Sequence, residues 1–276
     1  TWYPKGGMYS VVQALYQLAC ELGVQFHFSE TVISTTVLDH KVKTVVTDKN
    51  IYEPELVISS ADYHFTDTKL YPERFRSYSD AYWDKKTMAP SCLLYYVGLN
   101  KKLKNAVHHS LFFDTSFEKH GNEIYKNPQW PEEPLFYVSI PSITDEAAAP
   151  AGCEAMVFLI PVAAGLVGDT EALREKYFQL ILSRMEKHLG ETIHDAVIFK
   201  KSYSVSDFSR DFNSFKGNAY GMANTLMQTA IFRPSCRSKK IKNLFFAGQL
   251  TVPGPGVPPC LISGEVAARE AVKSFK

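Results

Sequence analysis

The stretch that decides the fold lies near the C-terminus and reads Leu244-Phe-Phe-Ala-Gly-Gln-Leu-Thr-Val-Pro-Gly-Pro-Gly-Val-Pro-Pro-Cys-Leu-Ile-Ser-Gly264. Its first four residues are apolar and predict a short buried strand, which Gly248 ends. A loop of glycines and prolines follows over 251–259, and helical spacing over 261–275, with a proline placed to begin the helix. A strand, a bare-backbone loop and a helix N-terminus together predict a seat for an anionic or electron-rich group.

The composition is that of a globular protein without a strong charge. The 276 residues are 45% hydrophobic and 13% aromatic, with a formal net charge of +1, so no global field recruits nucleic acid or anionic lipid. The five cysteines are odd in number and widely spaced, and none forms a C-x-x-C pair. We therefore expect reduced thiols in a cytoplasmic protein, with no disulfide frame and no metal site. The sequence shows no signal peptide and no run long enough to span a bilayer.

The first 60 residues predict a small α/β unit. A helix is expected over 8–22, because Met8, Val11, Leu15 and Leu18 share one face. Strands are then expected at Val24–Phe28, Thr31–Val37, Lys41–Thr47 and Leu56–Ser59, with a tight turn at Asp39-His40.

The middle of the chain is rich in predicted strands. They are expected at Ser91–Gly98, Leu135–Ile140, Ala155–Pro161 and Ala196–Ser204, with helices at Glu73–Lys86 and Thr170–Leu189. The terminal strand and helix cannot bury themselves, so we expect them to pack beside the first 60 residues. The predicted division is 1–64 and 241–276 as one domain, with 65–240 inserted as another.

Several motifs, each weak alone, occur in one family's order. They are Tyr3-Pro-Lys-Gly-Gly7, Leu94-Tyr-Tyr-Val-Gly-Leu-Asn100, His108-His109, Phe112-Phe113, Pro141-Ser-Ile-Thr-Asp145, Ala149-Pro-Ala-Gly152, Asp207-Phe208, Gly217-x-Ala219-x-Gly221, Gln228-x-Ala230-x-Phe232-Arg-Pro234 and the opening stretch. Together they resemble the C-terminal half of the phytoene desaturase family of bacterial carotenoid desaturases. The resemblance implies an α/β plus α+β fold, in which an incomplete FAD/NAD(P)-binding Rossmann-like unit carries an inserted mixed-sheet substrate domain.

The chain departs from that family in two places. Val252 stands where many relatives carry histidine, so no acid–base role is assigned there. The Gly-x-Gly-x-x-Gly fingerprint that holds the ADP half of FAD is absent from all 276 residues. We therefore expect this chain alone to be a fragment that binds FAD weakly or not at all and is inactive by itself.

The resemblance implies cofactor contacts in two segments. In the opening stretch they are Gly248, Gln249, Pro253, Gly254, Gly256, Val257 and Pro258, which would contact the FAD pyrophosphate and the flavin ring. Val32 would contact the adenine through its backbone. The alternatives are a plain Pro/Gly connection, a polyproline-type ligand at Pro255-x-x-Pro258, and an ordinary strand valine.

Aromatic residues of the middle segment are the candidates for a polyene-binding surface. The candidates are Tyr95, Tyr96, Phe112, Phe136 and Phe158, with Phe113 and Tyr137 beside them. Plain core packing is the alternative for each residue. No residue is assigned as catalytic, although His108, His109 and the Asp207–Arg210–Asp211 cluster carry groups that could titrate. Arg233 could hold the loop or face a cofactor phosphate.

The function implied by the resemblance is FAD-dependent desaturation of a long apolar polyene such as phytoene, with a hydride passing to the flavin and a proton to a base or water. The partner would be a polyene or isoprenoid substrate, reached by peripheral contact with the inner face of the membrane. The alternatives are an amine-oxidase-like oxidase, a carotenoid ketolase or isomerase, and a partner-binding fragment without catalysis.

Overall fold

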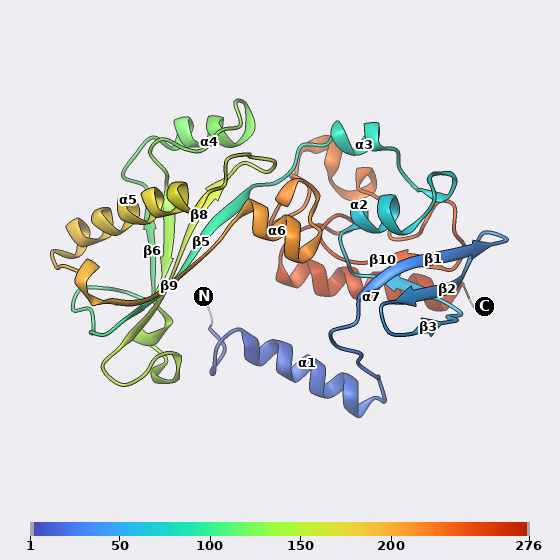
Figure 1. Ribbon diagram of the computed structural model, residues 1–276, viewed down its shortest axis with the longest axis horizontal. Helices are drawn as coiled ribbons and strands as arrows, with labels where there is room; N and C mark the ends of the chain where they lie inside the picture. The colour runs from blue at the N-terminus through green and yellow to red at the C-terminus, as the bar shows by residue number, and fades with distance from the viewer. Residues whose placement is uncertain (1–2, 275–276) are drawn as a thin grey trace. The chain divides into compact units, whose positions relative to one another are not determined.

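The computed structural model describes residues 3–274, which divide into two compact units (Figure 1). Within the described residues, the first unit comprises 3–27, 92–162 and 166–204, and the second comprises 28–91, 163–165 and 205–274. Residues 3–27 thus group with the strand-rich middle of the chain. The division predicted at residues 64 and 240 differs from these boundaries and stays a prediction.

A small antiparallel sheet opens the second unit. Its strands are β1 (Val32–Leu38), β2 (Lys41–Thr47) and β3 (Ile51–Tyr52), and the β1–β2 turn uses positive φ at Asp39 and His40. The predicted hairpin is therefore confirmed. The strand predicted at Val24–Phe28 is wrong, because these residues pair with no strand, and the Phe26 ring packs 4.6 Å from the Tyr16 ring.

A parallel strand pair links the two ends of the second unit. β4 (Val57–Ser59) pairs with β10 (Leu244–Phe246), with Phe245 opposite Ile58. Asn243 anchors β10: its Oδ1 accepts the N–H of Val42 at 2.8 Å, and its amide donates to the carbonyls of Val42 and Glu55. The prediction that the terminal strand returns beside the first 60 residues is therefore confirmed. Helix α7 (Val257–Lys273) follows, with Ser263, Ala267 and Ala271 buried.

Short helices complete the second unit. They are α2 (Tyr63–Phe65), a π-helical turn (Thr66–Leu70), a 3₁₀ turn (Glu73–Phe75), α3 (Asp80–Asp84) and α6 (Val205–Phe212). The single helix predicted at Glu73–Lys86 is wrong. The Asp67 carboxylate accepts the N–H groups of Ser77 and Tyr78 at 2.9–3.0 Å, which holds the chain extended there, and Ser79 then caps α3.

The first unit is built on a five-stranded sheet in the order β6-β7-β8-β5-β9. The strands are β5 (Ser91–Leu99), β6 (His109–Phe112), β7 (Phe136–Ser139), β8 (Glu154–Val162) and β9 (Val197–Tyr203). Helix α5 (Glu171–Leu189) is confirmed, with Thr170 capping the Leu173 N–H at 3.2 Å and Gly190 closing it at φ 69°. Helices α1 (Tyr9–Glu21) and α4 (Phe117–Tyr125) belong to the same unit, and α1 buries none of its residues.

Candidate functional site

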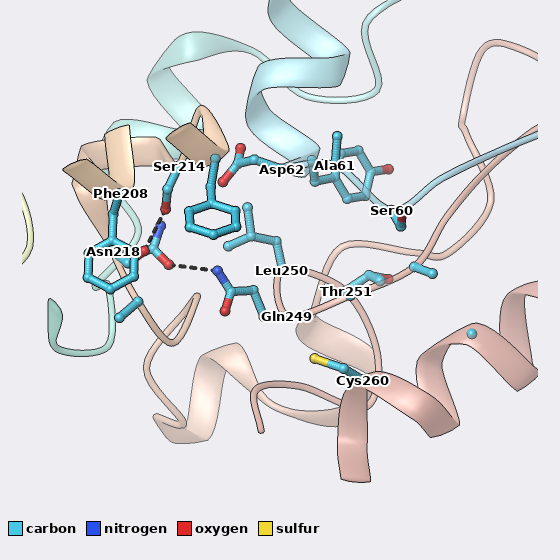
Figure 2. Close-up of a pocket in the computed structure, with 16 residues that line it drawn as sticks. Ser60, Ala61, Asp62, Phe208, Ser214, Asn218, Gln249, Leu250, Thr251 and Cys260 are labelled. Carbon is cyan, nitrogen blue, oxygen red and sulfur yellow. Dashed lines mark hydrogen bonds between the residues drawn. The ribbon is translucent and has the colours of Figure 1, made fainter. Parts of the chain in front are cut away.

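A cavity of about 540 Å³ opens where β4 and β10 end (Figure 2). Both strands are parallel, so their carboxyl ends meet at one edge, which is where open α/β sheets bind ligands. The lining comes from four segments of the second unit: Ser60–Tyr63 after β4, Phe208 to Ala219 around the end of α6, Ala247–Thr251 after β10, and Cys260 with Gly264 on α7.

Backbone geometry shapes the cavity at Gly248. This residue lies at φ 113°, and a Cβ there would meet only the Ser60 carbonyl oxygen, at 3.9 Å. Its N–H donates to Ser263 Oγ of α7 at 3.0 Å, and the preceding Ala247 N–H donates to the Ser59 carbonyl. Only glycine adopts this φ without strain, so the chain here presents bare backbone to the cavity.

Asp62 is the only carboxylate among the described lining residues. Its Oδ1 accepts the Phe65 N–H at 2.9 Å and its Oδ2 accepts the Phe215 N–H at 3.0 Å, so it caps α2 and fixes the segment after α6. Burial raises the pKa of this carboxyl, while both backbone donors oppose the shift. Asp62 therefore works as a structural anchor in the cavity wall.

A buried polar network supports the other wall. Asn218 Oδ1 accepts the side-chain amide of Gln249 at 3.1 Å (Figure 2). The same oxygen accepts the Gly221 N–H at 2.6 Å. Arg233 donates to the Gln249 carbonyl at 3.2 Å and to Asn224 Oδ1 at 2.6 Å, and its guanidinium lies against Gly254. Burial lowers the pKa of Arg233, which within the described residues has only neutral oxygens as acceptors. Arg233 therefore holds the loop, one of the two roles expected for it.

The cavity lies in a cationic part of the sequence. The residues from Phe212 to Gly264 include no aspartate or glutamate, but they include Lys216, Arg233, Arg237, Lys239, Lys240 and Lys242. Most of the described lining residues come from this stretch, but none of its six basic residues lines the cavity, where the charged side chain is that of Asp62.

The predicted cofactor residues fall into two groups. Gly248 and Gln249 line the cavity, whereas Pro253, Gly254, Gly256, Val257 and Pro258 form the loop and the start of α7 outside the lining set. Pro258 and Pro259 carry no backbone N–H. Of the three residues that begin α7 ahead of Cys260, Val257 therefore has the backbone N–H. Val32 begins β1, half-buried and opposite Thr47. These assignments stay predictions.

The lining residues after β4 and around α6 were not predicted from the sequence. Ser60 and Asp62 directly follow the buried strand that was predicted at 56–59, and the terminal strand was expected to return beside it. Parallel pairing of the two would have placed both carboxyl ends at one edge. Phe208, Ser214 and Asn218 carry no such signal, because tertiary packing brings their segment to the cavity.

The predicted aromatic residues divide between the two faces of the sheet in the first unit. Tyr95, Phe112, Phe136 and Phe158 are buried, with Tyr95 packed against Phe178 of α5 at 5.3 Å. Tyr96 is 41% exposed. Successive strand residues point to opposite faces, so Tyr95 and Tyr96 cannot line the same surface. The four buried rings belong to the face that α5 covers. Their position agrees with core packing, the alternative given for each of them.

The opposite face, called here the open face, carries its own apolar row. The pairing register aligns Leu111 of β6 with Tyr137 of β7 and Leu159 of β8, and aligns Ser139 with Val157. These residues are half-buried or exposed and alternate with the buried ones along each strand. Leu94 and Tyr96 lie on the corresponding face of β5. The two-residue period of a strand, applied from Tyr96 to Leu94, would have predicted this face from the sequence.

The titratable candidates have local partners. His108 and His109 stack at 4.1 Å, with His108 bonded to Thr144 Oγ1 and His109 to the Tyr137 hydroxyl. Arg210 pairs with Asp207 and Asp211 on a largely exposed turn of α6. Within residues 3–274, no group of three or more histidine, cysteine or acidic side chains could hold a metal ion. No helix over the same residues combines the length and apolarity needed to cross a bilayer.

Comparison with known families gives a match over nearly the whole chain. The model for flavin-containing amine oxidoreductases matches residues 1–272. A carotenoid 3,4-desaturase of Haloarcula japonica is 38% identical over 99% of this chain and 55% of its own length. A zeta-carotene-forming phytoene desaturase of Myxococcus xanthus is 30% identical over 96% of this chain and 51% of its own. The chain thus spans about half the length of the curated relatives it matches.

The fold is also found among solved structures. An oxidoreductase of Methanosarcina mazei matches with a TM-score of 0.66 over 97% of this chain and 55% of its own, at 16% identity. At that identity the likeness supports the fold alone. The predicted α/β plus α+β class and the resemblance to carotenoid desaturases are both confirmed.

Proposed function

Because the chain belongs to the family of flavin-containing amine oxidoreductases, we propose that it is part of an FAD-dependent enzyme that desaturates a long apolar polyene. The single observation that carries the proposal is the cavity at the carboxyl ends of β4 and β10, which Gly248 leaves open as bare backbone. The relatives' names add the substrate class, since they describe desaturases of carotenoids and phytoene.

The residues of the cavity fit one part of a flavin dinucleotide. Bare backbone at Gly248 and the side-chain amide of Gln249 suit close approach of an electron-rich group. Pro253, Gly254, Gly256, Val257 and Pro258 would continue this contact along the loop. Val32 would contact the adenine. The chain alone is proposed to bind FAD weakly, because its sequence contains no Gly-x-Gly-x-x-Gly to hold the ADP half.

The open face of the first unit is the proposed polyene surface. Leu94, Tyr96 and Leu159 offer apolar area, with Lys201 of the edge strand β9 beside Tyr96, and a hydrocarbon can gain about 25 cal/mol for each Å² it buries. Of the five aromatic residues predicted from the sequence to bind the polyene, we propose that Tyr96 contacts it. The other four would act indirectly, because they pack the sheet against α5 and hold its open face in place.

FAD, when bound, supplies the acceptor for a hydride from the polyene. The chain's own contribution is to hold that cofactor and to exclude water from an apolar substrate. Asp62 is not proposed as the proton acceptor, because both of its oxygens accept backbone N–H groups that cap α2 and fix Phe215. The proton passes to water or to a base outside the groups assigned here.

The test is FAD binding by the full-length protein that contains this chain, followed by flavin fluorescence. Gly248→Val should raise the Kd for FAD about tenfold or more, a loss of about 1.4 kcal/mol or more, because a branched side chain would enter the cavity at an unsuitable φ. Gly168→Val is the matched control: it also has a positive φ, with open space around it, but lies in the first unit. Equal effects of the two substitutions would overturn the cofactor assignment.

The substrate arm uses phytoene delivered in detergent, with product absorption as the readout. Tyr96→Asp should abolish the red-shifted product, while leaving the Kd for FAD unchanged, since a carboxylate on the open face is costly beside a hydrocarbon. Tyr125→Asp serves as the control for the same substitution away from the open face, because Tyr125 is 51% exposed on α4 of the same unit. An active Tyr96→Asp protein would contradict the proposed surface.

A further inference from the structure

A short apolar segment projects from the second unit. The 3₁₀ turns Leu226–Gln228 and Ala230–Phe232 present Leu226 at 84% exposure, Met227 at 63%, Ile231 at 89% and Phe232 at 47%. The apolar segment, as residues 226–232 are called here, therefore exposes four large hydrophobic side chains within seven residues. Such clusters on a surface mark an interaction site more often than single exposed residues do.

The apolar segment is held outward by buried polar contacts. Gln228, in its centre, is buried and accepts the Thr87 N–H at 3.0 Å while donating to the carbonyls of Thr87 and Ala223. Arg233, immediately after it, is buried and donates to the Met222 carbonyl. The segment is thus clamped at its middle and at its end. Its apolar side chains face solvent because the clamp fixes the backbone.

Two lysines lie beside the middle of the apolar segment. Lys85 and Lys86 directly precede Thr87, which the Gln228 side chain grips, and Lys86 lies over the Tyr82 ring at 4.3 Å. The nearby acids are paired: Asp80 with Arg76 at 3.3 Å, and Asp84 with Lys216 at 4.0 Å. The segment itself lies in the acid-free stretch from Phe212 to Gly264.

A basic cavity lies at the 3₁₀ turn Glu73–Phe75, and Lys240 of the acid-free stretch contributes to its lining. It has a volume of about 540 Å³ and is lined by Arg74, Arg76, Lys240, three residues from Ser77 to Ser79, and the acids Glu73 and Asp80. The Arg76 Nε is buried without an acceptor among the described residues. Lys240 is eight residues beyond Phe232, so the cavity entrance lies within about 28 Å of the apolar segment at full chain extension. A lipid surface is wide enough to span this distance.

We propose that the apolar segment inserts into an anionic phospholipid surface, with Lys85, Lys86 and the basic cavity contacting the headgroup phosphates. Apolar side chains flanked by lysines match a lipid surface, where the chains enter the acyl boundary and the cations meet the headgroups. A second protein copy would need a complementary broad face, whereas two short turns offer projecting tips. The inference deepens the proposed function, since an apolar polyene resides in the bilayer, but lipid binding requires no flavin.

The test is co-sedimentation of the chain with vesicles of phosphatidylcholine and phosphatidylglycerol in a three-to-one ratio. Leu226→Ser/Ile231→Ser should lower the partition coefficient about fivefold or more. Leu38→Ser/Ile51→Ser is the matched control, because Leu38 is 59% exposed and Ile51 is 69% exposed in the hairpin sheet of the same unit. It should bind as the unchanged chain does. Circular dichroism and thermal melting establish that both variants are folded.

A second arm tests the charges. Lys85→Glu/Lys86→Glu should weaken binding to these vesicles about threefold or more, and the difference should vanish on pure phosphatidylcholine. Failure of the unchanged chain to bind, or equal loss in both serine variants, would overturn the proposal. It would also fall if Leu226→Ser/Ile231→Ser dissolved a dimer, or if the full-length protein shielded Ile231→Cys from maleimide without lipid. FAD affinity and desaturation of phytoene in detergent are separate readouts, so failure here leaves the proposed function standing.

Discussion

The strand-end cavity of the second unit and the open face of the first present two kinds of surface. At the cavity, the backbone forms much of the surface, because Gly248 has no side chain to fill the space. Buried side chains such as Asn218 and Arg233 hold the loop. At the open face, the backbone is fully paired in a sheet, and alternate side chains make the surface. Substitutions at the cavity are therefore expected to act by changing the backbone conformation. On the sheet, the effect of a substitution depends on whether the residue lies on the covered face or on the open face.

The largest expected effect separates the two faces of the sheet. Phe158→Ala should lower the free energy of unfolding by about 3–5 kcal/mol, because it removes a fully buried ring from the face that α5 covers. Tyr96→Ala, on the open face, should cost about 1 kcal/mol or less. Urea unfolding followed by circular dichroism measures both. Similar losses would mean that the open face is core, and the contrast between faces would fail.

A smaller effect is expected where the cavity is anchored. Asn243→Ala should destabilise the second unit by about 2–3 kcal/mol, because it leaves the N–H and carbonyl of Val42 and the carbonyl of Glu55 without their partner. Lys242→Ala, at the exposed neighbouring position, should be nearly neutral. Hydrogen exchange of β4 and β10 amides reports the effect locally. Unchanged exchange in Asn243→Ala would show that strand pairing alone aligns the cavity edge.

Elements with a regular hydrophobic period and clear cap or turn residues at their ends could be predicted from the sequence. Helix α5 has a cap at Thr170 and a stop at Gly190, and the β1–β2 hairpin has its turn residues, so local chemistry suffices for both. The helix predicted through Ser77 failed because a distant carboxylate, that of Asp67, captures the backbone N–H groups. No local signal in residues 73–86 announces that contact.

The candidate sites divide in the same way. The Gly/Pro stretch indicated Gly248 because glycine adopts a positive φ, here 113°, without strain. Asn218 and Phe208 reach the cavity through tertiary packing, which a single sequence does not encode in any short pattern. For the sheet, the signal was present: choosing neighbouring Tyr95 and Tyr96 ignored the two-residue period of a strand.

The smallest expected effect is a pH dependence on the covered side of the sheet. His120 is buried, its Nε2 lies 2.8 Å from the Pro161 carbonyl, and its Nδ1 accepts the Leu135 N–H. Burial lowers the pKa of His120 below the usual value near 6.5. The unfolded chain then binds more protons, so this contribution to stability is complete above pH 6.5 and is lost as the pH falls through 6.5 toward the lowered pKa.

The measurement is the urea midpoint of the chain between pH 5 and 7.5, compared with that of His120→Gln. The unchanged chain should lose more stability on acidification than the glutamine variant, which cannot titrate at this position. Other histidines contribute equally to both proteins, so the difference isolates His120. Parallel curves would show that His120 keeps an ordinary pKa and that this side of the sheet admits a charge.

Hydrogen–deuterium exchange of the full-length protein, measured with and without FAD, tests whether the strand-end cavity binds the cofactor. We predict that FAD slows exchange in the segments after the two parallel strands, Ser60–Tyr63 and Ala247–Thr251, while the strands β6 and β7 of the sheet are unaffected. Gly248→Val should remove that protection, and Gly168→Val should preserve it. Protection by FAD that spares both segments would contradict the assignment of the strand-end cavity to the cofactor.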